Sequence, residues 1–434
     1  MFLKLFFMDI KKIHSLFLQC NSIAIDTRKV NENSFFVALK GERFDANSFA
    51  KEALEKGASY VIIDNKEYFI NEKTILVDDS LVALQELAKF HRNFLKLPII
   101  ALTGSNGKTT TKELINVVLA KKFNVTATVG NLNNHIGVPL TLLSFTKNTE
   151  IGIVEMGANH QKEIEFLCAI TQPDFGYITN FGKAHLEGFG GVDGVIKGKS
   201  EMYSYLIANK KKVFVNLDDT LQDQKTKNLQ RFTFSSLDEK STVFIKKCTA
   251  NPLVTISFNE TTIHSSLIGL YNANNINAAI TIGNHFGVSD TQIKEAIESY
   301  IPENNRSQML TKATNEIILD AYNANPSSMI VALENFIQLK NENKTIIIGD
   351  MFELGNESLM EHKAIVSYLI SNENIDTFFV GTDFYLNQVE KTNFKFFKTF
   401  EDLSSYLKLN EIKNNIILIK GSRGMALERT LDFI

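Results

Sequence analysis

The sequence predicts an α/β protein of three domains, in which helices cover mainly parallel sheets. Its 434 residues exceed the size at which one hydrophobic core usually keeps growing. Short apolar runs of strand length alternate with segments of helical periodicity, which is the pattern of strands joined by crossover helices. A glycine-rich segment at 104–107 directly follows one of these runs. We place the domains at residues 1–96, 97–312 and 313–434.

The first domain is predicted to be a small α/β unit. Its apolar runs are rich in β-branched and aromatic residues, and helical patterns lie between and after them. This alternation within fewer than 100 residues favours a short sheet with helices packed on it. We predict strands at 34–39, 60–63 and 74–77, and helices at 48–56 and 81–94.

The other two domains repeat the alternation on a larger scale. The run IIAL passes through the glycine-rich segment into a helical pattern at 111–123, and later runs are separated widely enough for crossover helices. From about residue 314 the alternation restarts, which favours a separate, Rossmann-like third domain. We predict strands at 99–102, 151–155, 175–180 and 212–216, and then at 316–321, 344–351, 376–382, 394–400 and 414–422.

The composition is that of an ordinary globular protein. Hydrophobic residues make up 44% of the chain, with 33 Phe and no Trp, so disorder is not expected. A formal net charge of -3 gives no general attraction to nucleic acid or anionic membranes, so a phosphate-bearing ligand requires a local site. Cys20, Cys168 and Cys248 lie far apart and lack metal-ligand spacing, as in a reducing compartment. We expect a cytoplasmic monomer that binds no nucleic acid.

The first residues, MFLKLFFMDI, are apolar and do not resemble a targeting segment. Lys4 interrupts the run, Asp9 follows it, and no small-residue cleavage site is present. The run is too short to span a bilayer, so no membrane insertion is expected. We expect translation to begin at Met8 instead of Met1.

The segment GSNGKTT predicts an ATP site at a strand–loop–helix junction. Gly104 and Gly107 let backbone amides turn towards an anion, and Lys108 brings a positive charge to the β- and γ-phosphates. The following helix adds the positive end of its dipole. The general P-loop pattern has Gly where this chain has Leu102, so the match is incomplete. The ATP-binding residues are expected to be Thr103, Gly104, Ser105, Asn106, Gly107, Lys108, Thr109 and Thr110.

A series of further strings resembles one enzyme family. TGSNGKTTTK resembles the ATP loop of Mur ligases and folylpolyglutamate synthases. GNLNNHIGVPLTLL, VEMGANHQKEI, TNFGKAHLEGFG, IKGKSEM and YNANNINAAI then follow in the order found in Mur ligases. LDAYNANPSSM, GDMFELG and IKGSRGM resemble the forms found in the member that adds a dipeptide. The resemblance covers nearly the whole chain and implies an ATP-dependent ligase joining D-alanyl-D-alanine to UDP-N-acetylmuramoyl-tripeptide through an acyl phosphate.

The segment DTRKVNENSFFVALKGERFDANSF resembles the uridine-nucleotide region of that family, where DSR and KGE-R-DGH are usual. Ala46 and Asn47 stand where Gly and His are common, and Thr replaces Ser at position 27. These changes affect the fine hydrogen bonds to the UDP group. The substrate-binding residues that the resemblance implies are Thr27, Arg28, Lys40, Gly41 and Asn134.

The metal ligands and catalytic groups come mostly from the resemblance. Glu155 ends a predicted strand, where open α/β sheets place their ligands, although a lone carboxylate there can also be solvated. His185 resembles the family's ligand to a second Mg²⁺. Lys199 aligns with a lysine carried as a carbamate, with Lys197 as a nearby rival, whereas composition alone would make Lys199 a solvated helix lysine. We expect two Mg²⁺ ions held with the help of Thr109, Glu155, His185 and Lys199, and catalytic roles for Lys108, Lys199 and His185.

The resemblance also implies contacts to ATP from later segments. Two positions depart from the family pattern: Tyr271 stands where GxHN usually has His, and Asn305 where Gly is common before the arginine. Lys420 and Arg423 either orient a substrate anion or form structural pairs. The later ATP contacts are expected to be Asn275, Arg306, Asp320 and Asn323, for which asparagine turns and a surface arginine are the structural alternatives.

Other functions remain open at this stage. A sister Mur ligase adding the third amino acid, or a folate polyglutamylase, would share the ATP loop, and a P-loop ATPase that forms no bond would share it too. The uridine-like first domain disfavours folate. The motifs do not select between diaminopimelate and lysine in the acceptor tripeptide. We also expect the third domain to close over the cleft and exclude water from the acyl phosphate.

Overall fold

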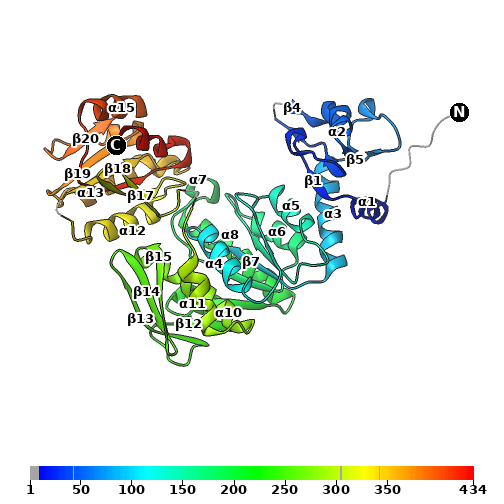
Figure 1. The fold of residues 1–434 in the computed structure, drawn as a ribbon, viewed down its shortest axis with the longest axis horizontal. Coiled ribbons are helices and arrows are strands. Elements are labelled where there is room, and N and C mark those ends of the chain that lie inside the picture. Colours follow the sequence, from blue (N-terminus) through cyan, green and yellow to red (C-terminus); the bar gives the residue numbers. More distant parts are fainter. Residues whose placement is uncertain (1–8, 43, 304, 342) are drawn as a thin grey trace.

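The computed structural model describes residues 9–42, 44–303, 305–341 and 343–434. Within these residues the strands form three large sheets in chain order, together with one two-stranded ribbon. We call each large sheet with its covering helices a lobe, and Figure 1 shows the first and third lobes standing on opposite sides of the central one. No helix in the described ranges has the length and apolar character needed to cross a membrane. The predicted start at Met8 lies outside the described residues.

The first lobe is a parallel sheet in the order β1-β2-β5-β6, as predicted for a small α/β unit. The predicted helix at 48–56 begins later than expected, because a 3-10 turn capped by Asp45 precedes it. Its elements are α1 (Ile10–Phe17), β1 (Ser22–Ala24), η1 (Thr27–Lys29), β2 (Ser34–Val37), β3 (Lys40–Gly41), β4 (Phe44–Asp45), η2 (Ala46–Phe49), α2 (Ala50–Glu55), β5 (Ala58–Ile63), η3 (Lys66–Tyr68), β6 (Thr74–Leu76) and α3 (Ser80–Leu95).

Helix α3 connects the first lobe to the central one. It packs against α1 of its own lobe and against α5 (Gly137–Leu143) and α6 (Glu163–Thr171) of the next. At this joint His14 Nε2 lies 2.9 Å from His91 Nδ1, and His91 Nε2 lies 2.9 Å from the Phe145 carbonyl oxygen. Because a carbonyl only accepts, His91 Nε2 carries the proton and His14 Nε2–H donates to His91 Nδ1. Burial lowers the pKa of both rings, that of His14 to about 4, so both are neutral near pH 7.

The central sheet has the order β15-β14-β13-β12-β11-β10-β7-β9-β8. The predicted strands β7, β9, β10 and β11 are parallel, as expected, and β8, β12 and β13, which were not predicted, extend this parallel part. Strands β14 and β15 add an antiparallel edge. Only two residues join each of these two strands to the strand before it, whereas a parallel crossover needs a dozen or more residues. The short connections therefore make β14 and β15 antiparallel. The strands are β7 (Ile99–Thr103), β8 (Val125–Ala127), β9 (Ile151–Glu155), β10 (Phe175–Ile178), β11 (Lys212–Asn216), β12 (Gln230–Ser235), β13 (Val243–Ala250), β14 (Leu253–Phe258) and β15 (Thr261–Ile268).

Helices on both faces bury this sheet and bring its carboxyl ends to one edge. Strand β7 lies between β9 and β10, so the chain leaves all three at the same edge. Apolar residues of α4 and α10 pack together over one face. Besides α5 and α6, the helices are α4 (Lys108–Leu119), α7 (Leu186–Phe189), α8 (Val192–Ala208), α9 (Thr220–Thr226), η4 (Leu270–Asn272), α10 (Ala273–His285) and α11 (Asp290–Ser299).

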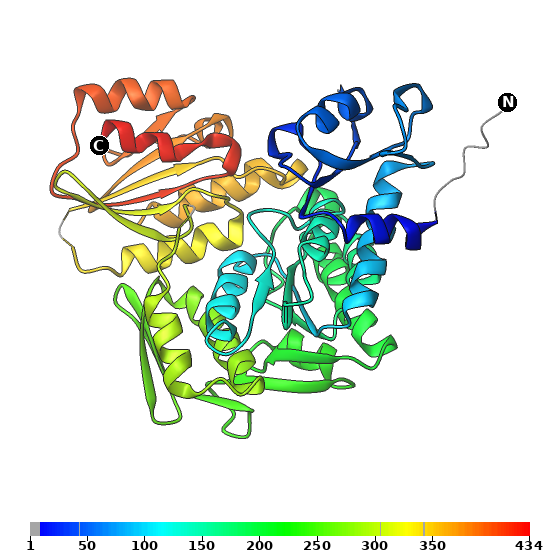
Figure 2. The same ribbon diagram turned by 45° about the vertical axis from the view of Figure 1, so that its right-hand side comes forward.

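The third lobe contains the sheet β16-β17-β21-β18-β19-β20, parallel except for β16. Figure 2 shows this lobe, coloured yellow to red, resting on the central lobe. Strand β16 precedes residue 313 and pairs with β17, while the domain divisions at 96/97 and 312/313 stay predictions. The elements are β16 (Gln308–Lys312), β17 (Asn315–Asp320), α12 (Pro326–Ile337), β18 (Lys344–Gly349), η5 (Gly355–Glu357), α13 (Ser358–Leu369), β19 (Ile375–Val380), α14 (Thr382–Leu386), β20 (Phe394–Phe397), α15 (Phe400–Leu409), β21 (Ile416–Lys420), η6 (Arg423–Met425) and η7 (Leu427–Phe433).

The histidine pair makes stability fall in acid. Unfolded His14 takes up a proton below its ordinary pKa of 6.5, whereas the folded chain resists protonation of this ring down to a pKa of about 4. The free energy of unfolding should therefore be unaffected by this group above pH 6.5 and decrease by up to about 3 kcal/mol as the pH falls through that window. Denaturant titrations between about pH 8 and pH 4 would measure it. His14→Phe should weaken the pH dependence and the exposed control His264→Gln should not; equal curves for wild type and His14→Phe would contradict the assignment.

Candidate active site

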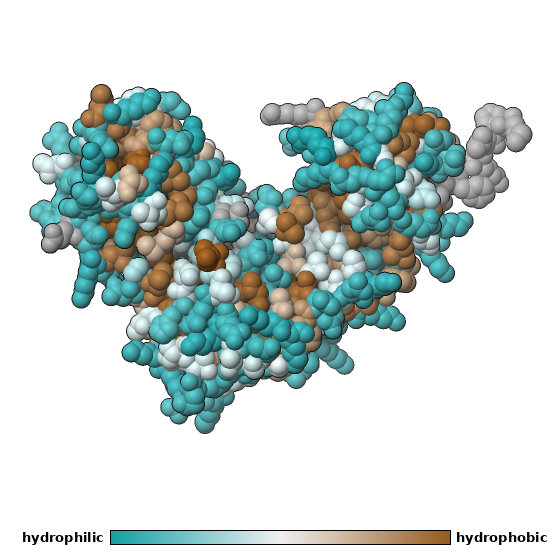
Figure 3. Space-filling view, in the orientation of Figure 1, coloured by the Kyte–Doolittle hydropathy of each residue, from teal (hydrophilic) through white to brown (hydrophobic). Residues whose placement is uncertain are grey.

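A cleft of about 750 Å³ opens between the carboxyl edge of the central sheet and the third lobe. Figure 3 shows the surface hollowed between the first and third lobes, above the central one. The volume of the cleft lies in the range of small-molecule binding sites. Most predicted ATP and metal residues line it, together with the predicted substrate residue Asn134: Ser105, Asn106, Gly107, Lys108, Thr109, Thr110, Glu155, His185, Asn275, Arg306, Asp320 and Asn323.

The glycine loop is fastened against the end of β10. Thr179 Oγ1 donates a hydrogen bond to the Asn106 carbonyl oxygen at 2.6 Å, and Ser105 Oγ donates to the Gly182 carbonyl oxygen at 2.6 Å. Gly104 has φ +147°, and a Cβ there would lie 1.9 Å from Thr179 Oγ1. This position therefore tolerates only glycine. Thr103 and Gly104 do not line the cleft themselves but carry the loop that does.

Lys108 is the first residue of α4 and lies inside the loop. Its ammonium donates to the carbonyl oxygens of Gly104, at 2.8 Å, and Ser105, at 3.4 Å. Burial lowers the pKa of Lys108; Glu155 opposes this shift and Arg306 adds to it. An anion bound in the loop would restore the cationic form, because it supplies the opposite charge that the buried ammonium lacks.

Glu155 offers an uncompensated oxygen at the end of β9. Its side chain is 1% exposed. Oε1 accepts a hydrogen bond from Asn133 Nδ2 at 2.9 Å, while the buried Oε2 has no hydrogen-bond partner within the described part of the chain. A buried carboxylate oxygen of this kind requires a partner, and a hard cation in the cleft would be one.

The donor set fits Mg²⁺ better than a metal caged by protein. Across the residues that the structure describes, no group of three or more His, Cys, Asp and Glu side chains could hold a metal ion. Mg²⁺ is usually bound by one or two carboxylates together with substrate phosphates and water. Glu155 and the Thr109 hydroxyl beside the phosphate loop fit that pattern.

His185 faces the third lobe. It adopts a left-handed conformation, with φ +53°, directly before α7. Its Nδ1 pairs with Glu353 Oε2, and this hydrogen bond holds the pKa of Glu353 below its usual value. His185 lines the cleft, and ligation of Mg²⁺ by His185 stays a prediction.

Lys199 is not the solvated helix lysine that composition alone suggests. Its side chain is 1% exposed and its ammonium lies 5.1 Å from the centroid of the Phe189 ring. Burial lowers the pKa of Lys199 well below its usual value; Lys108 adds to the shift and Glu163 opposes it. Lys197 is exposed. The uncharged amine needed for carbamate formation is therefore favoured at Lys199, which does not itself line the cleft.

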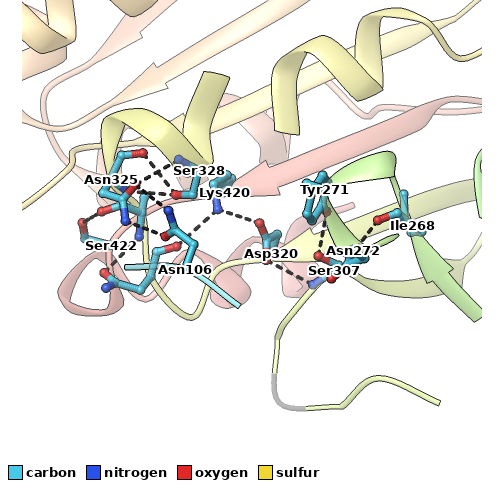
Figure 4. Close-up of polar contacts among 12 residues, drawn as sticks. Asn106, Ile268, Tyr271, Asn272, Ser307, Asp320, Asn325, Ser328, Lys420 and Ser422 are labelled. Atoms are coloured by element: carbon cyan, nitrogen blue, oxygen red, sulfur yellow. Dashed lines mark hydrogen bonds and ion pairs between the residues drawn. The ribbon is translucent and has the colours of Figure 1, made fainter. Parts of the chain in front are cut away.

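The third lobe contributes a hydrogen-bonded group at the opposite wall, drawn in Figure 4. Lys420 Nζ donates to Asp320 Oδ2 at 2.6 Å and to the Asn323 carbonyl oxygen at 3.3 Å. The Arg306 guanidinium lies 3.6 Å from the centroid of the Tyr322 ring. Arg423 does not line the cleft and pairs with Glu428 at 2.7 Å.

Asn275 and Asn134 have structural partners although both line the cleft. Asn275 Oδ1 accepts from Thr111 Oγ1 at 3.0 Å, and its Nδ2 donates to Asn272 Oδ1 at 2.8 Å. Asn134 Oδ1 accepts from the backbone N–H of Gly137 at 2.9 Å and so caps the start of α5. Contact of either side chain with a ligand stays a prediction.

Sequence reasoning missed the contacts that cross between the central and third lobes. Asn325 Nδ2 donates to Asn106 Oδ1 at 2.7 Å. Lys183 donates through its backbone N–H to Ser327 Oγ at 2.7 Å and through its ammonium to Glu361 Oε1 at 2.6 Å. An asparagine before Pro326 could be recognised as a helix cap, but its partner 219 residues away could not.

The predicted uridine-site residues lie together at the carboxyl edge of the first sheet. Thr27 and Arg28 follow β1, and Lys40 and Gly41 follow its parallel neighbour β2. None of them lines the cleft. Lys40 Nζ lies 2.9 Å from Asp64 Oδ1, Asn47 donates to the same oxygen at 2.8 Å, and Arg28 pairs with Asp26 at 2.6 Å.

The collision at Gly104 predicts a selective loss of nucleotide binding. Gly104→Ala should weaken ADP binding on the order of 100-fold, because the new methyl group would displace Thr179 and the loop. Titration calorimetry with ADP would measure this, with circular dichroism to check folding. Gly190→Ala is the matched control, since its φ is also positive at +75° but a Cβ there meets nothing within 4 Å. Equal ADP affinity in Gly104→Ala and Gly190→Ala would show that the loop geometry is not required.

Three family models match the chain in order. They are Mur ligase family, catalytic domain, at residues 19–92; Mur ligase middle domain, at 102–283; and Mur ligase, glutamate ligase domain, at 305–423. The UDP-N-acetylmuramoyl-tripeptide--D-alanyl-D-alanine ligase of Bacillus subtilis is 34% identical over 419 residues, covering 94% of this chain and 92% of that one.

Solved structures of full-length relatives share the fold. MurF from Acinetobacter baumannii is 30% identical with a TM-score of 0.85, covering 98% of this chain and 97% of that one. MurF ligase from Thermotoga maritima in complex with ADP is 26% identical with a TM-score of 0.81, covering 96% of this chain and 97% of that one. With these matches and the geometry of the cleft, the chain belongs to the Mur ligase family.

Proposed function

We propose that this chain joins D-alanyl-D-alanine to UDP-N-acetylmuramoyl-tripeptide with the consumption of ATP, forming the pentapeptide precursor of peptidoglycan. The observation that carries the proposal is a cleft that combines a phosphate loop, an uncompensated carboxylate oxygen at Glu155 and a wall from a second lobe. Relatives that match nearly the whole chain carry the name of this ligase. The activity also explains why three lobes are present, since three substrates must meet.

ATP is proposed to bind along the loop at 104–110. The backbone amides and the amino end of α4 face the phosphates, and Lys108 exchanges its present carbonyl partners for phosphate oxygens. The Thermotoga maritima relative was solved in complex with ADP. We place Asn275 at the adenine end and Arg306 at the phosphates, and Asp320 and Asn323 meet the nucleotide from the third lobe; all four line the same cleft.

The first chemical step is transfer of the γ-phosphoryl group to the terminal carboxylate of the tripeptide. An oxygen of the carboxylate forms the new bond to phosphorus, and ADP leaves as the bond to the β-phosphate oxygen breaks. Lys108 and Arg306 neutralise charge on the phosphate oxygens, which dominates this barrier. When bound, two Mg²⁺ ions would supply further charge neutralisation; we assign them to Thr109, Glu155, His185 and Lys199.

The second step is attack of the dipeptide amine on the acyl phosphate, which releases phosphate. Positioning of the amine is the main requirement, because the acyl phosphate is already activated. The contacts Asn106–Asn325 and Lys183–Glu361 hold the third lobe against the loop. Closure of the third lobe over the bound substrates is proposed to exclude water from the acyl phosphate.

We place the enzyme in the cytoplasm and infer that it acts as a monomer. The three cysteines are free, as expected where thiols stay reduced. One chain supplies the phosphate loop, the carboxylate and the opposing wall of the cleft. Thr27, Arg28, Lys40 and Gly41 are proposed to hold the UDP group, with Asn134 nearer the cleft.

A coupled assay of ADP release tests the ligation. With UDP-N-acetylmuramoyl-tripeptide and D-alanyl-D-alanine, ADP should form together with a product heavier by the dipeptide, and Lys108→Ala should reduce the rate on the order of 100-fold or more. Omission of the dipeptide should suppress release. ADP formed regardless of acceptor would instead indicate a P-loop ATPase. ADP formed with the muramoyl dipeptide and a single amino acid, but not with the tripeptide and D-alanyl-D-alanine, would indicate a sister ligase.

Carbamate formation at Lys199 predicts dependence on carbon dioxide. Burial lowers the pKa of Lys199 and so favours the neutral ε-amine, which can add CO₂ and lose a proton to become an oxygen anion. Activity should fall several-fold in CO₂-depleted buffer and return on addition of bicarbonate. With ¹³C-bicarbonate, wild type and Lys197→Ala should show a protein-bound carbamate resonance that Lys199→Ala lacks. Identical spectra of Lys199→Ala and Lys197→Ala would exclude the modification at this residue.

A further inference from the structure

Tyr271 occupies the junction between the central and third lobes. It lies in η4, between β15 and the helix α10 that carries Asn275. Gly269 has φ +83°, and a Cβ there would lie 2.4 Å from Tyr271 Cε1 and 2.9 Å from Asn335 Nδ2 of α12. The Tyr271 ring therefore packs closely against the backbone at Gly269, next to α12 of the third lobe.

The hydroxyl of Tyr271 reaches across the junction. It lies 2.7 Å from Ser307 Oγ, the last residue before β16 (Figure 4). Burial raises the pKa of Tyr271, with Asp320 adding to the shift and the bond to Ser307 opposing it. The hydroxyl thus stays protonated throughout the physiological range and remains a hydrogen-bond donor.

Ser307 is held on two sides. Its backbone N–H donates to Asp320 Oδ1 at 3.1 Å, and the other carboxylate oxygen of Asp320 accepts from Lys420 at 2.6 Å. Ser307 has φ +50° and Asn305 has φ +58°, a conformation that non-glycine residues adopt only when their surroundings enforce it. The hydrogen bonds that Ser307 forms with Tyr271 and Asp320 hold its backbone in this conformation.

Arg306 lies between these two left-handed residues. Its guanidinium stacks on Tyr322 at 3.6 Å from the ring centroid and lines the cleft. Arg306 and the loop residue Lys108 line the same cleft, so the charge of Arg306 faces the space where phosphate is proposed to bind. The direction of the Arg306 side chain therefore depends on the backbone that Ser307 fixes.

We propose that Tyr271 is a positioning residue for ATP, which acts through Ser307 to hold Arg306 and Asp320 in the cleft. The chain of contacts begins in the central lobe at Tyr271 and ends in the third lobe at Lys420, so it also sets how the two walls of the nucleotide site face each other. This inference rests on the proposed function for its kinetic test but not for its binding test.

Tyr271→Phe removes only the hydroxyl and tests the proposal. Direct titration with ADP should show a Kd raised roughly three- to tenfold, as expected for loss of one hydrogen bond. In the ligation assay kcat/KM for ATP should fall by a similar factor or more, because Arg306 also neutralises charge during phosphoryl transfer, while the KM for D-alanyl-D-alanine changes less than about twofold. Tyr406→Phe, which removes a hydroxyl from an aromatic cluster on the far side of the third sheet, is the matched control.

Two further variants separate positioning from a general effect on folding. Ser307→Ala should reproduce the Tyr271→Phe phenotype, and the double variant should be no worse than either, because both remove one interaction. Tyr271→His again provides a side chain that can form hydrogen bonds. It should bind ADP more tightly than Tyr271→Phe does, and the two variants should have equal melting temperatures.

Three outcomes would overturn the proposal. They are an unchanged Kd for ADP in Tyr271→Phe, additive effects in the double variant, or an equal loss of affinity for ATP and for D-alanyl-D-alanine. If the wild-type protein bound ADP but formed none from ATP when the dipeptide was added, the proposed function would be refuted. The binding test of Tyr271 would still stand.

Discussion

The seating of the glycine loop on the end of β10 is the contact on which the rest of the site depends. Thr179 holds the Asn106 carbonyl, and the absence of a side chain at Gly104 permits that approach. With the loop fixed there, α4 must start at Lys108 and point its amino end into the cleft. Glu155 faces the same space because β9 lies directly beside β7. The location of phosphate, cation and helix dipole is thus set by strand pairing.

Much of the fold could be predicted from the sequence because its strands are short and strongly apolar. Runs such as 151–155 and 212–216 correspond residue for residue to β9 and β11. The antiparallel strands β14 and β15 were missed, since their alternating and partly polar residues carry a weaker signal than a buried parallel strand. The two-residue connections before β14 and β15 could have indicated these strands, because such short connections join antiparallel strands.

The candidate site divides in the same way. Local motifs predicted the phosphate loop and placed Glu155 at a strand end, because both depend on neighbours in sequence. The burial of Lys199 was not predictable, as it follows from Phe189 packing against the small residues Gly194 and Gly198 on α8. Contacts such as Asn106–Asn325 join residues 219 positions apart and arise only when the lobes are assembled.

The proposed binding of UDP by Arg28 and Lys40, which lie outside the cleft, would have a consequence for selection among substrates. A molecule anchored by its diphosphate at the edge of the first sheet must extend to the phosphate loop before its terminal carboxyl can react. A peptide stem that is too short would leave the carboxyl out of range, and one that is too long would crowd the opposite wall. On this proposal the protein selects its acceptor by the length of the peptide stem, without contacting every side chain along it.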